Sequence, residues 1–217
     1  MRGGIQTVEQ GTAEWFEARV GKVTASEVWK VMAFTETTTL KSGKVKPGKP
    51  KADYWNYLDD IIGEILTEQP ADHFVTDAMK DGQMQEADAC ELYSIQNNVM
   101  VDKVGFVDHP TIPRFGASPD RLVGPVGMVE AKCPKKSTHI RMLRTGDIDS
   151  KYVYQMHAQL MCTGREWCDF ISFYFGLPLF QVRVFPDAAI HKAIEERVRE
   201  FVELAIDQAS KIGEDVA

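Results

Sequence analysis

Apolar residues in the first half of the chain recur at the three- and four-residue spacing of amphipathic helices. The clearest example consists of Tyr54, Leu58, Ile61, Ile62, Ile65 and Leu66. The same pattern predicts a short helix from Thr12, which can cap it, through Arg19, a second helix over 24–33 and a long third helix over about 76–94. The chain is therefore expected to begin with a group of helices.

The second half of the chain alternates between strand and helix patterns. Strands are expected over 99–108, 115–123, 128–133, 169–176 and 179–185. Helical spacing resumes from Ser137, is clearest over 150–162, and defines a last amphipathic helix from Asp187. This order predicts an α/β fold, with a central mixed sheet flanked by helices, in a single domain spanning 1–217.

The composition is that of a soluble globular protein, with 44% hydrophobic and 26% charged residues. No apolar run approaches the roughly 20 residues that span a bilayer, and the first ten residues lack the apolar region of a secretory signal. We therefore expect a cytoplasmic protein with no membrane partner.

The net charge of −7 argues weakly against a nucleic acid partner, but the distribution of charge matters more than its sum. Five lysines fall between Lys41 and Lys51, in a Gly- and Pro-containing segment that is expected to be a flexible loop. A second basic group runs from Lys132 to Arg144. Nucleic acid binding therefore stays open.

The cysteines are Cys90, Cys133, Cys162 and Cys168. Their spacing fits neither a zinc site nor an iron–sulfur cluster. We expect reduced, buried thiols.

The stretch over 118–134, with the sequence SPDRLVGPVGMVEAKCP, mixes charged residues with an apolar strand pattern. If residues 124–126 form the loop of a hairpin, Asp120 lies directly opposite Glu130, with Cβ atoms about 4.5–5.5 Å apart. Lys132 shares that face, two residues beyond Glu130. The positions on the other face, which suit a core, are Val129, Ala131 and Cys133.

Two opposed carboxylates repel each other, and a divalent cation between them relieves both the repulsion and the cost of burial. Oxygen-only ligands favour Mg²⁺ or Mn²⁺ over zinc. Lys132 could position or deprotonate an attacking water, or stabilise a phosphorane-like transition state. Glu86, on a largely small and apolar helix face, is a candidate third acid. The alternative is a solvated strand face on which Lys132 simply bridges Glu130, with Glu86 on a solvated helix position.

Pro119-Asp120 and Glu130-Ala131-Lys132 reproduce the signature of the PD-(D/E)xK nuclease superfamily. Five motifs, in order, resemble the family of lambda exonuclease and the YqaJ-type viral recombinases, also called alkaline exonucleases. They are EQGTAEWFEARVGKVTASEV, GQMQEADA, GASPDRL, VEAKCP and YVYQMHAQ. Together the motifs span about three quarters of the chain, so chance similarity is improbable.

The resemblance implies a restriction-endonuclease-like core and a Mg²⁺-dependent nuclease with two ions per active site, for which Mn²⁺ can substitute. It implies digestion of linear double-stranded DNA from its 5′ ends, with release of 5′-mononucleotides and a 3′ single-stranded overhang for recombination. A ring-shaped homotrimer threaded by DNA, and a single-strand annealing protein as partner, are also implied.

The resemblance also assigns roles to individual residues. The implied metal ligands are Asp120, Glu130, Glu86 and the carbonyl of Ala131. The implied catalytic residues are Lys132, Tyr152 and Gln155, acting with Asp120 and Glu130. The implied contacts of the terminal 5′-phosphate are Arg19, Ser26 and Ser118. A guanidinium binds phosphate bidentately and hydroxyls complete the oxygen shell, so the last set is chemically sensible.

Thr138 departs from the family pattern, because a relative carries an arginine six residues after the catalytic lysine. The nearby basic residues that could supply the missing charge are Lys135, Lys136, His139 and Arg141. The basic loop over 41–51 could contact DNA as well.

Two other functions stay open. A restriction-like or structure-specific endonuclease would use the same acids to cut DNA internally. A DNA-end-binding protein with a vestigial metal site would bind without turnover, although the complete set of acids and lysine argues against decay.

Overall fold

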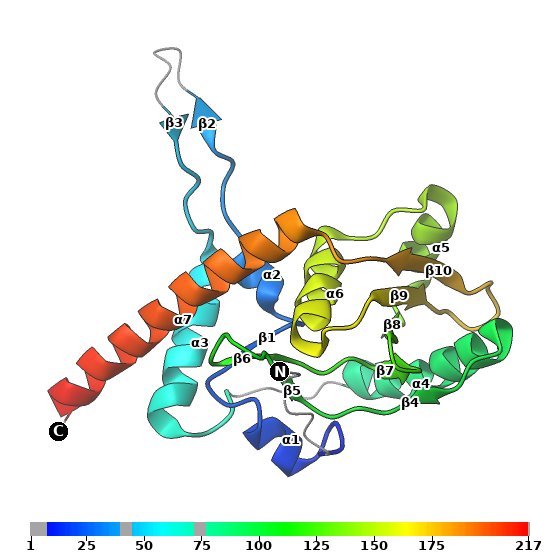
Figure 1. The fold of residues 1–217 in the computed structure, drawn as a ribbon, viewed down its shortest axis with the longest axis horizontal. Helices are drawn as coiled ribbons and strands as arrows, with labels where there is room; N and C mark the ends of the chain where they lie inside the picture. The colour runs from blue at the N-terminus through cyan, green and yellow to red at the C-terminus, as the bar shows by residue number, and fades with distance from the viewer. Residues whose placement is uncertain (1–7, 40–44, 72–76, 217) are drawn as a thin grey trace.

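A mixed five-stranded sheet lies at the centre of the larger half of the computed structural model, which describes residues 8–39, 45–71 and 77–216 (Figure 1). The strand order is β10 (Phe180–Val184), β9 (Trp167–Ser172), β8 (Gly127–Lys132), β7 (Arg121–Val123) and β4 (Val101–Asp102). Strands β8 and β9 are parallel, and the other neighbours are antiparallel. The predicted central mixed sheet is therefore confirmed.

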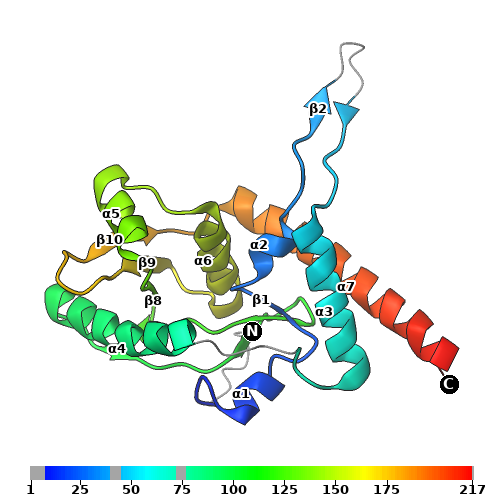
Figure 2. The ribbon, with the colours of Figure 1, turned by 180° about the vertical axis from the view of Figure 1, so that it is seen from behind.

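Helices cover both faces of this sheet (Figures 1 and 2). On one face α4 (Asp77–Asn97) packs through Ala89, Cys90 and Tyr93 against alternate residues of the strands, including Val129 and Ala131. On the other face lie α5 (Lys136–Thr145) and α6 (Ser150–Thr163). The core on that side is formed by Met128, Met142, Met156, Leu160, Cys168, Phe170 and Phe180.

A second, helical half of the molecule adjoins α6. Its three-stranded sheet has the order β1 (Val23–Thr24), β6 (Phe115–Ala117) and β5 (Val107–Asp108). Its helices are α1 (Ala13–Glu17), α2 (Val28–Val31), α3 (Ala52–Thr67) and α7 (Ala188–Val216). The long α7 lies along α3, and its last turns extend away from the sheet (Figure 1). The aromatic ring of Phe201 on α7 packs against Tyr54 and Tyr57 of α3, which fixes this pair of helices.

Several helix boundaries follow the sequence prediction. Thr12 caps α1 by accepting a hydrogen bond from the backbone N–H of Trp15, and Asp187 accepts from the N–H groups of Ala189 and Ile190 at the start of α7. The helix predicted over 24–33 is shorter than expected, because residues 23 and 24 pair with β6 and only Val28–Val31 is helical.

Two of the predicted strands are each broken in two. The strand expected over 115–123 becomes β6 and β7, which belong to different sheets, and the strand expected over 99–108 becomes β4 and β5. The break in the first case falls at Ser118, Pro119 and Asp120. Proline has no N–H to donate to a sheet, so Pro119 suits the point where the chain leaves one sheet for the other.

One strand of a short hairpin falls in the segment over 41–51, which was expected to be a flexible basic loop. Strands β2 (Thr38–Thr39) and β3 (Val45–Lys46) pair antiparallel and project away from the rest of the molecule (Figure 1). The intervening lysines, Lys41 and Lys44, lie outside the described residues.

The four cysteines are free thiols, as expected; Cys133 is half-buried and the others are buried. Within the described ranges, no helix is long and apolar enough to cross a membrane.

Candidate active site

The hairpin formed by β7 and β8 has the register that the sequence predicts. Arg121 pairs with Val129 and Val123 with Gly127, and continuing this register one residue outward places Asp120 opposite Glu130. Asp120 lies at the corner between β6 and β7, where one carboxylate oxygen accepts a hydrogen bond of 2.7 Å from the backbone N–H of Ala131. This bond fixes the aspartate against the strand that carries Glu130 and Lys132.

Glu130 is fully buried and is held by side chains from its own strand and from α6. The amide nitrogens of Gln155 and Gln159 donate to its two oxygens at 2.7 and 2.6 Å. The Lys132 ammonium lies 2.5 Å from one of these oxygens and 5.3 Å from the ring centre of Tyr152. The structure thus brings Tyr152 and Gln155 to Glu130 and Lys132.

Gln159 is a site residue that the sequence analysis missed. It lies one helical turn after Gln155 on α6 and is fully buried. The Oε1 atom of its side-chain amide has no hydrogen-bond partner in the described part of the chain. The spacing of four residues was the available signal, because residues i and i+4 share one face of a helix.

The charges at this site are poorly balanced. Burial raises the pKa of the Asp120 carboxyl well above its ordinary value, and the negative charges of Glu130 and Glu86 raise it further. Burial also raises the pKa of Glu86, although Arg121 counteracts this effect. Carboxylates are thus crowded together with too little positive charge to neutralise them.

Lys132 carries a positive charge in this environment. Burial alone would favour its neutral amine, but the carboxylates of Glu130 and Asp120 outweigh burial and raise the pKa of Lys132 above its ordinary value. An ammonium ion suits the stabilisation of a negatively charged phosphate better than the removal of a proton from water.

The chemistry of the donors fits a hard divalent cation. Asp120, Glu130 and Glu86 offer only oxygen atoms, which Mg²⁺ and Mn²⁺ prefer, and burial together with the neighbouring acids raises the pKa of Asp120, a cost that a bound cation would relieve. Among the described side chains no three His, Cys, Asp or Glu residues are already arranged to hold a metal ion. Glu130 is instead bound by Lys132 and the two glutamines.

Arg121 is a second residue that the sequence analysis did not single out. Its guanidinium donates to the backbone carbonyl of Asp120 at 2.5 Å and lies 3.4 Å from a carboxylate oxygen of Glu86. Strand alternation turns Arg121 away from the Asp120 face and toward α4, which carries Glu86. Arg121 is therefore a cation that holds Glu86 in this structure.

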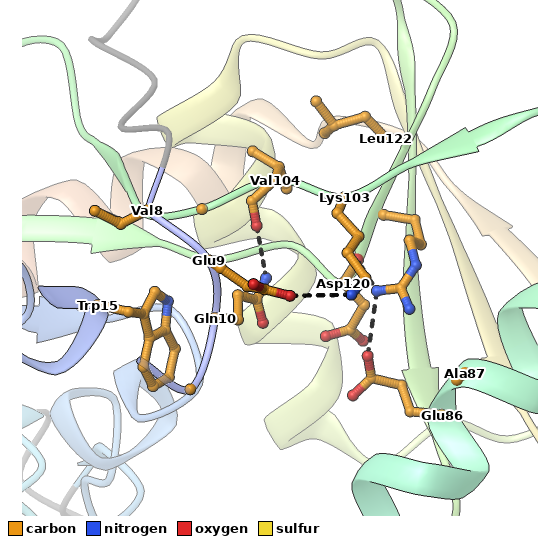
Figure 3. Close-up of a pocket in the computed structure, with 13 residues that line it drawn as sticks. Val8, Glu9, Gln10, Trp15, Glu86, Ala87, Lys103, Val104, Asp120 and Leu122 are labelled. Carbon is orange, nitrogen blue, oxygen red and sulfur yellow. Dashed lines mark hydrogen bonds and ion pairs between the residues drawn. The ribbon is translucent and has the colours of Figure 1, made fainter. Parts of the chain in front are cut away.

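A cavity of about 750 Å³ opens beside these acids (Figure 3). Residues 8–11, Trp15, Glu86, Asp120 and Arg121 are among the residues that line it, and Figure 3 shows Trp15 and Glu86 on opposite sides. A ligand in this cavity would contact both α1 and the Asp120 corner.

The residues expected to bind a terminal phosphate lie around α1. The Arg19 guanidinium stacks on Trp15 at 4.0 Å from the ring centre, and the Trp15 indole N–H donates to the Ser118 hydroxyl at 2.9 Å. The Ser26 and Thr24 hydroxyls share a hydrogen bond of 3.1 Å. Burial lowers the pKa of Arg19, and among described residues its guanidinium makes no ion pair or hydrogen bond. An arginine held by stacking alone has its N–H donors available for a ligand.

The prediction that His139 contacts DNA is wrong. Its ring is completely buried, with Nδ1 2.8 Å from the Ser172 hydroxyl and Nε2 3.1 Å from the carbonyl of Pro178. His139 therefore attaches α5 to β9 and to the segment before β10. The signal for an inward position was Met142, three residues later on the same helix face and also buried.

The other basic residues of α5 and its start behave differently. Lys135, Lys136 and Arg141 are exposed, and Lys136 lies 5.5 Å from the ring centre of Tyr174. Helix α5 lies at the far side of the five-stranded sheet from α1 (Figures 1 and 2). These residues are thus separated from Arg19 and Ser118, and their role in DNA binding stays a prediction.

The sheet, its flanking helices and the Asp120–Glu130–Lys132 corner define an α/β protein with the PD-(D/E)xK nuclease fold. The family model of the YqaJ-like viral recombinase domain matches residues 14–166. The chain belongs to this family.

Solved structures agree with this assignment. The alkaline exonuclease LHK-Exo from Laribacter hongkongensis is 37% identical, with a TM-score of 0.82 over 94% of this chain and 98% of that one. LHK-Exo in complex with dAMP gives a TM-score of 0.83 at the same identity and coverage. A phage-related exonuclease from Haemophilus somnus 129PT, only 13% identical, shares the fold with a TM-score of 0.60 over 90% of this chain and 96% of that one. No curated protein sequence gives a significant match.

Proposed function

We propose that this protein is a metal-dependent DNA exonuclease that degrades one strand of linear double-stranded DNA from its 5′ end. The observation that carries the proposal is the convergence of Asp120, Glu130, Lys132 and Glu86 at one corner of the sheet. Membership of a recombinase family and 37% identity to an alkaline exonuclease support it. The products would be 5′-mononucleotides and a 3′ single-stranded overhang for recombination by single-strand annealing.

Asp120, Glu130, Glu86 and the carbonyl of Ala131 would hold Mg²⁺, or Mn²⁺ in its place. The chemistry that two such ions supply when bound is polarisation of the phosphate, activation of water and stabilisation of the attacking and leaving oxygens. Asp120 suits the role of a metal ligand because the Ala131 N–H already binds one of its carboxylate oxygens. This hydrogen bond orients the carboxylate.

The remaining residues of the site orient the reactants. Lys132, as an ammonium, would bind the scissile phosphate and stabilise the negative charge that develops on its oxygens. Gln155 and Gln159 fix the Glu130 carboxylate from α6. Tyr152 flanks Lys132 and restricts the path of its side chain. The cavity beside Asp120 has room for a terminal nucleotide, and LHK-Exo has been crystallised with dAMP.

The group around α1 would recognise the DNA end. Arg19 offers N–H donors that no described residue binds and that suit a phosphate, and the Ser118 and Ser26 hydroxyls would complete the oxygen shell. The exposed Lys135, Lys136 and Arg141 would contact the phosphate backbone further along the duplex.

A ring-shaped homotrimer and a single-strand annealing partner belong to the same proposal. They rest on the family relationship, since a ring that encloses DNA would explain processive digestion. Light scattering at micromolar concentrations should give the mass of a trimer, and a monomeric mass across that range would contradict this part of the proposal.

Digestion of labelled linear duplex tests the activity. In Mg²⁺ the wild-type protein should release nucleotides from the 5′-labelled strand, leave covalently closed circular DNA intact and stop when EDTA is added. Cutting of the closed circle would instead support an internal endonuclease. Tight binding of DNA ends without turnover, in both Mg²⁺ and Mn²⁺, would support an end-binding protein.

A further inference from the structure

Two side chains connect the amino-terminal segment to the residues immediately before Asp120. The amide nitrogen of Gln10 donates to the backbone carbonyl of Pro119 at 2.9 Å, and the Trp15 indole N–H donates to the Ser118 hydroxyl at 2.9 Å. The same Gln10 amide donates a second bond of 2.9 Å to the carbonyl of Val104. The corner that carries Asp120 is therefore bound to this segment at two consecutive residues.

The segment bound in this way also carries the candidate phosphate ligand. Trp15 contacts Ser118 through its indole N–H and Arg19 through its ring face. Gln10 lies just before α1 and Arg19 just after it, so the Gln10 bonds fix the start of the short helix that places Arg19. A displacement of α1 relative to the sheet would therefore change the distance between Arg19 and Asp120.

We propose that Gln10 is a positioning residue that couples recognition of the terminal 5′-phosphate to hydrolysis at the Asp120 corner. This inference rests on the proposed exonuclease function. Binding energy from a group that does not react can accelerate a reaction only if the protein transmits it into the placement of the reacting atoms. The Gln10 bonds provide that rigid connection, because they hold the phosphate-binding segment and the metal-binding corner in one frame.

The chemistry of the contact demands a donor at position 10. Both partners are backbone carbonyls, which only accept, and the glutamine amide supplies two N–H groups. Gln10→Glu preserves the shape but replaces both donors with acceptors, so it should repel the two carbonyls. Gln10→Met preserves the approximate length without any donor and tests the loss of the bonds without added charge.

The experiment measures kcat and KM on two linear duplexes that differ only in having a 5′-phosphate or a 5′-hydroxyl. For Gln10→Met, kcat on phosphorylated ends should fall about 10- to 100-fold while KM changes little, because a misplaced reactant loses rate more than affinity. The rate on hydroxyl ends should fall much less, so the preference for phosphorylated ends collapses. Gln10→Glu should act in the same direction and more strongly.

Two further variants make the result specific. Trp15→Phe keeps a ring against Arg19 but removes the indole N–H that Ser118 accepts, so it should reduce the same preference by a second route. Glu14→Gln changes an exposed residue on the same helix and should match the wild type. Thermal unfolding curves identify any variant that has lost its fold.

The outcomes separate the two proposals. If Gln10→Met and Trp15→Phe fold and keep the wild-type preference, or lose rate equally on both kinds of end, the coupling is wrong while the exonuclease proposal stands. If the wild-type protein itself digests both ends at one rate, recognition of the terminal phosphate is wrong and the coupling is wrong with it. Absence of any digestion by the wild type would overturn the function.

Discussion

Two carboxylates on opposite faces of the same sheet, one fully buried and one half-buried, show how differently a protein can treat a negative charge. Asp169 on β9 is fully buried and receives two bonds from Arg183 at 2.7 and 2.8 Å, one from the Tyr93 hydroxyl at 2.7 Å and one from Gln181 at 3.2 Å. The carboxylate of Asp120, just before β7, accepts one hydrogen bond from the described residues, donated by the backbone N–H of Ala131, and faces two further acids.

The comparison separates a structural role from a functional one. Both oxygens of the Asp169 carboxylate accept hydrogen bonds, and the carboxylate so connects α4 to the edge of the sheet. The Asp120 carboxylate lies in a group whose negative charges raise its pKa, which costs stability unless a cation is bound. Uncompensated buried acids are typical of sites at which a ligand supplies the missing charge.

Asp120→Asn should give the largest effect. The change keeps the shape and the acceptor for the Ala131 N–H but removes the charge of a proposed metal ligand, so nuclease activity should fall at least about 100-fold. Stability in EDTA should stay the same or rise, because one member of a repelling group is neutralised. Activity is measured by release of labelled nucleotides and stability by urea unfolding. A clear loss of stability together with retained activity would reverse the assignment.

Asp169→Asn, the matched control, should behave in the opposite way. It removes the negative charge that pairs with Arg183 and leaves one acceptor oxygen where Arg183 and Tyr93 use two, and we expect the free energy of unfolding to fall by about 2–3 kcal/mol, with partial solvation of Arg183 limiting the loss. At a temperature where the variant is folded, the cleavage rate should be close to that of the wild type. Loss of activity in a fully folded Asp169→Asn protein would mean that Asp169 is also part of the active site.

Removal of the metal should sharpen the contrast. A ligand present at 100 times its dissociation constant stabilises the folded state by about 2.7 kcal/mol, or about 5–10 °C for a chain of this size. Adding Mg²⁺ or Mn²⁺ to the EDTA-treated wild type should raise its melting temperature by that order, and the Asp120→Asn shift should be much smaller. Equal shifts in melting temperature for the wild type and Asp120→Asn would mean that the metal binds at a site without Asp120.

Arg121→Gln should give the smallest effect. Arg121 would compete with a bound metal ion for Glu86, so its removal should tighten Mg²⁺ binding by about fivefold, the equivalent of about 1 kcal/mol for a half-buried ion pair. Isothermal titration with Mg²⁺ measures the change. Arg197→Gln removes an Arg–Glu pair on α7 and should leave the affinity unaltered. Weaker binding in Arg121→Gln would show that Arg121 supports the site instead of competing with the metal.

The sequence predicted the centre of this site because its signals are local. Alternation along β8 and the loop before it are enough to place Asp120, Glu130 and Lys132 on one face. The sequence did not reveal that the chain passes from one sheet to the other at Ser118–Asp120. A strand pattern does not show with which neighbouring strand each part of the segment pairs.

The errors at the edge of the site have a common physical cause. His139 was grouped with Lys135, Lys136 and Arg141 as a candidate DNA contact, but the docking of α5 on β9 and β10 buries the face that it shares with Met142. Gln159 and Arg121 contact Glu130 and Glu86 only through tertiary packing. Such contacts depend on how the helices and strands are oriented relative to one another. The spacing of apolar residues along the sequence does not predict that orientation.

Strand-labelled digestion of linear duplex DNA by the wild type and by Lys132→Ala tests the central claim most directly. The wild type in Mg²⁺ should release label from the 5′-terminated strand and leave the complementary strand intact, while EDTA or the Lys132→Ala change should abolish release. A Lys132→Ala protein that degrades DNA as fast as the wild type, or release that persists in EDTA, would contradict the assignment of the Asp120–Glu130–Lys132 corner as the catalytic centre.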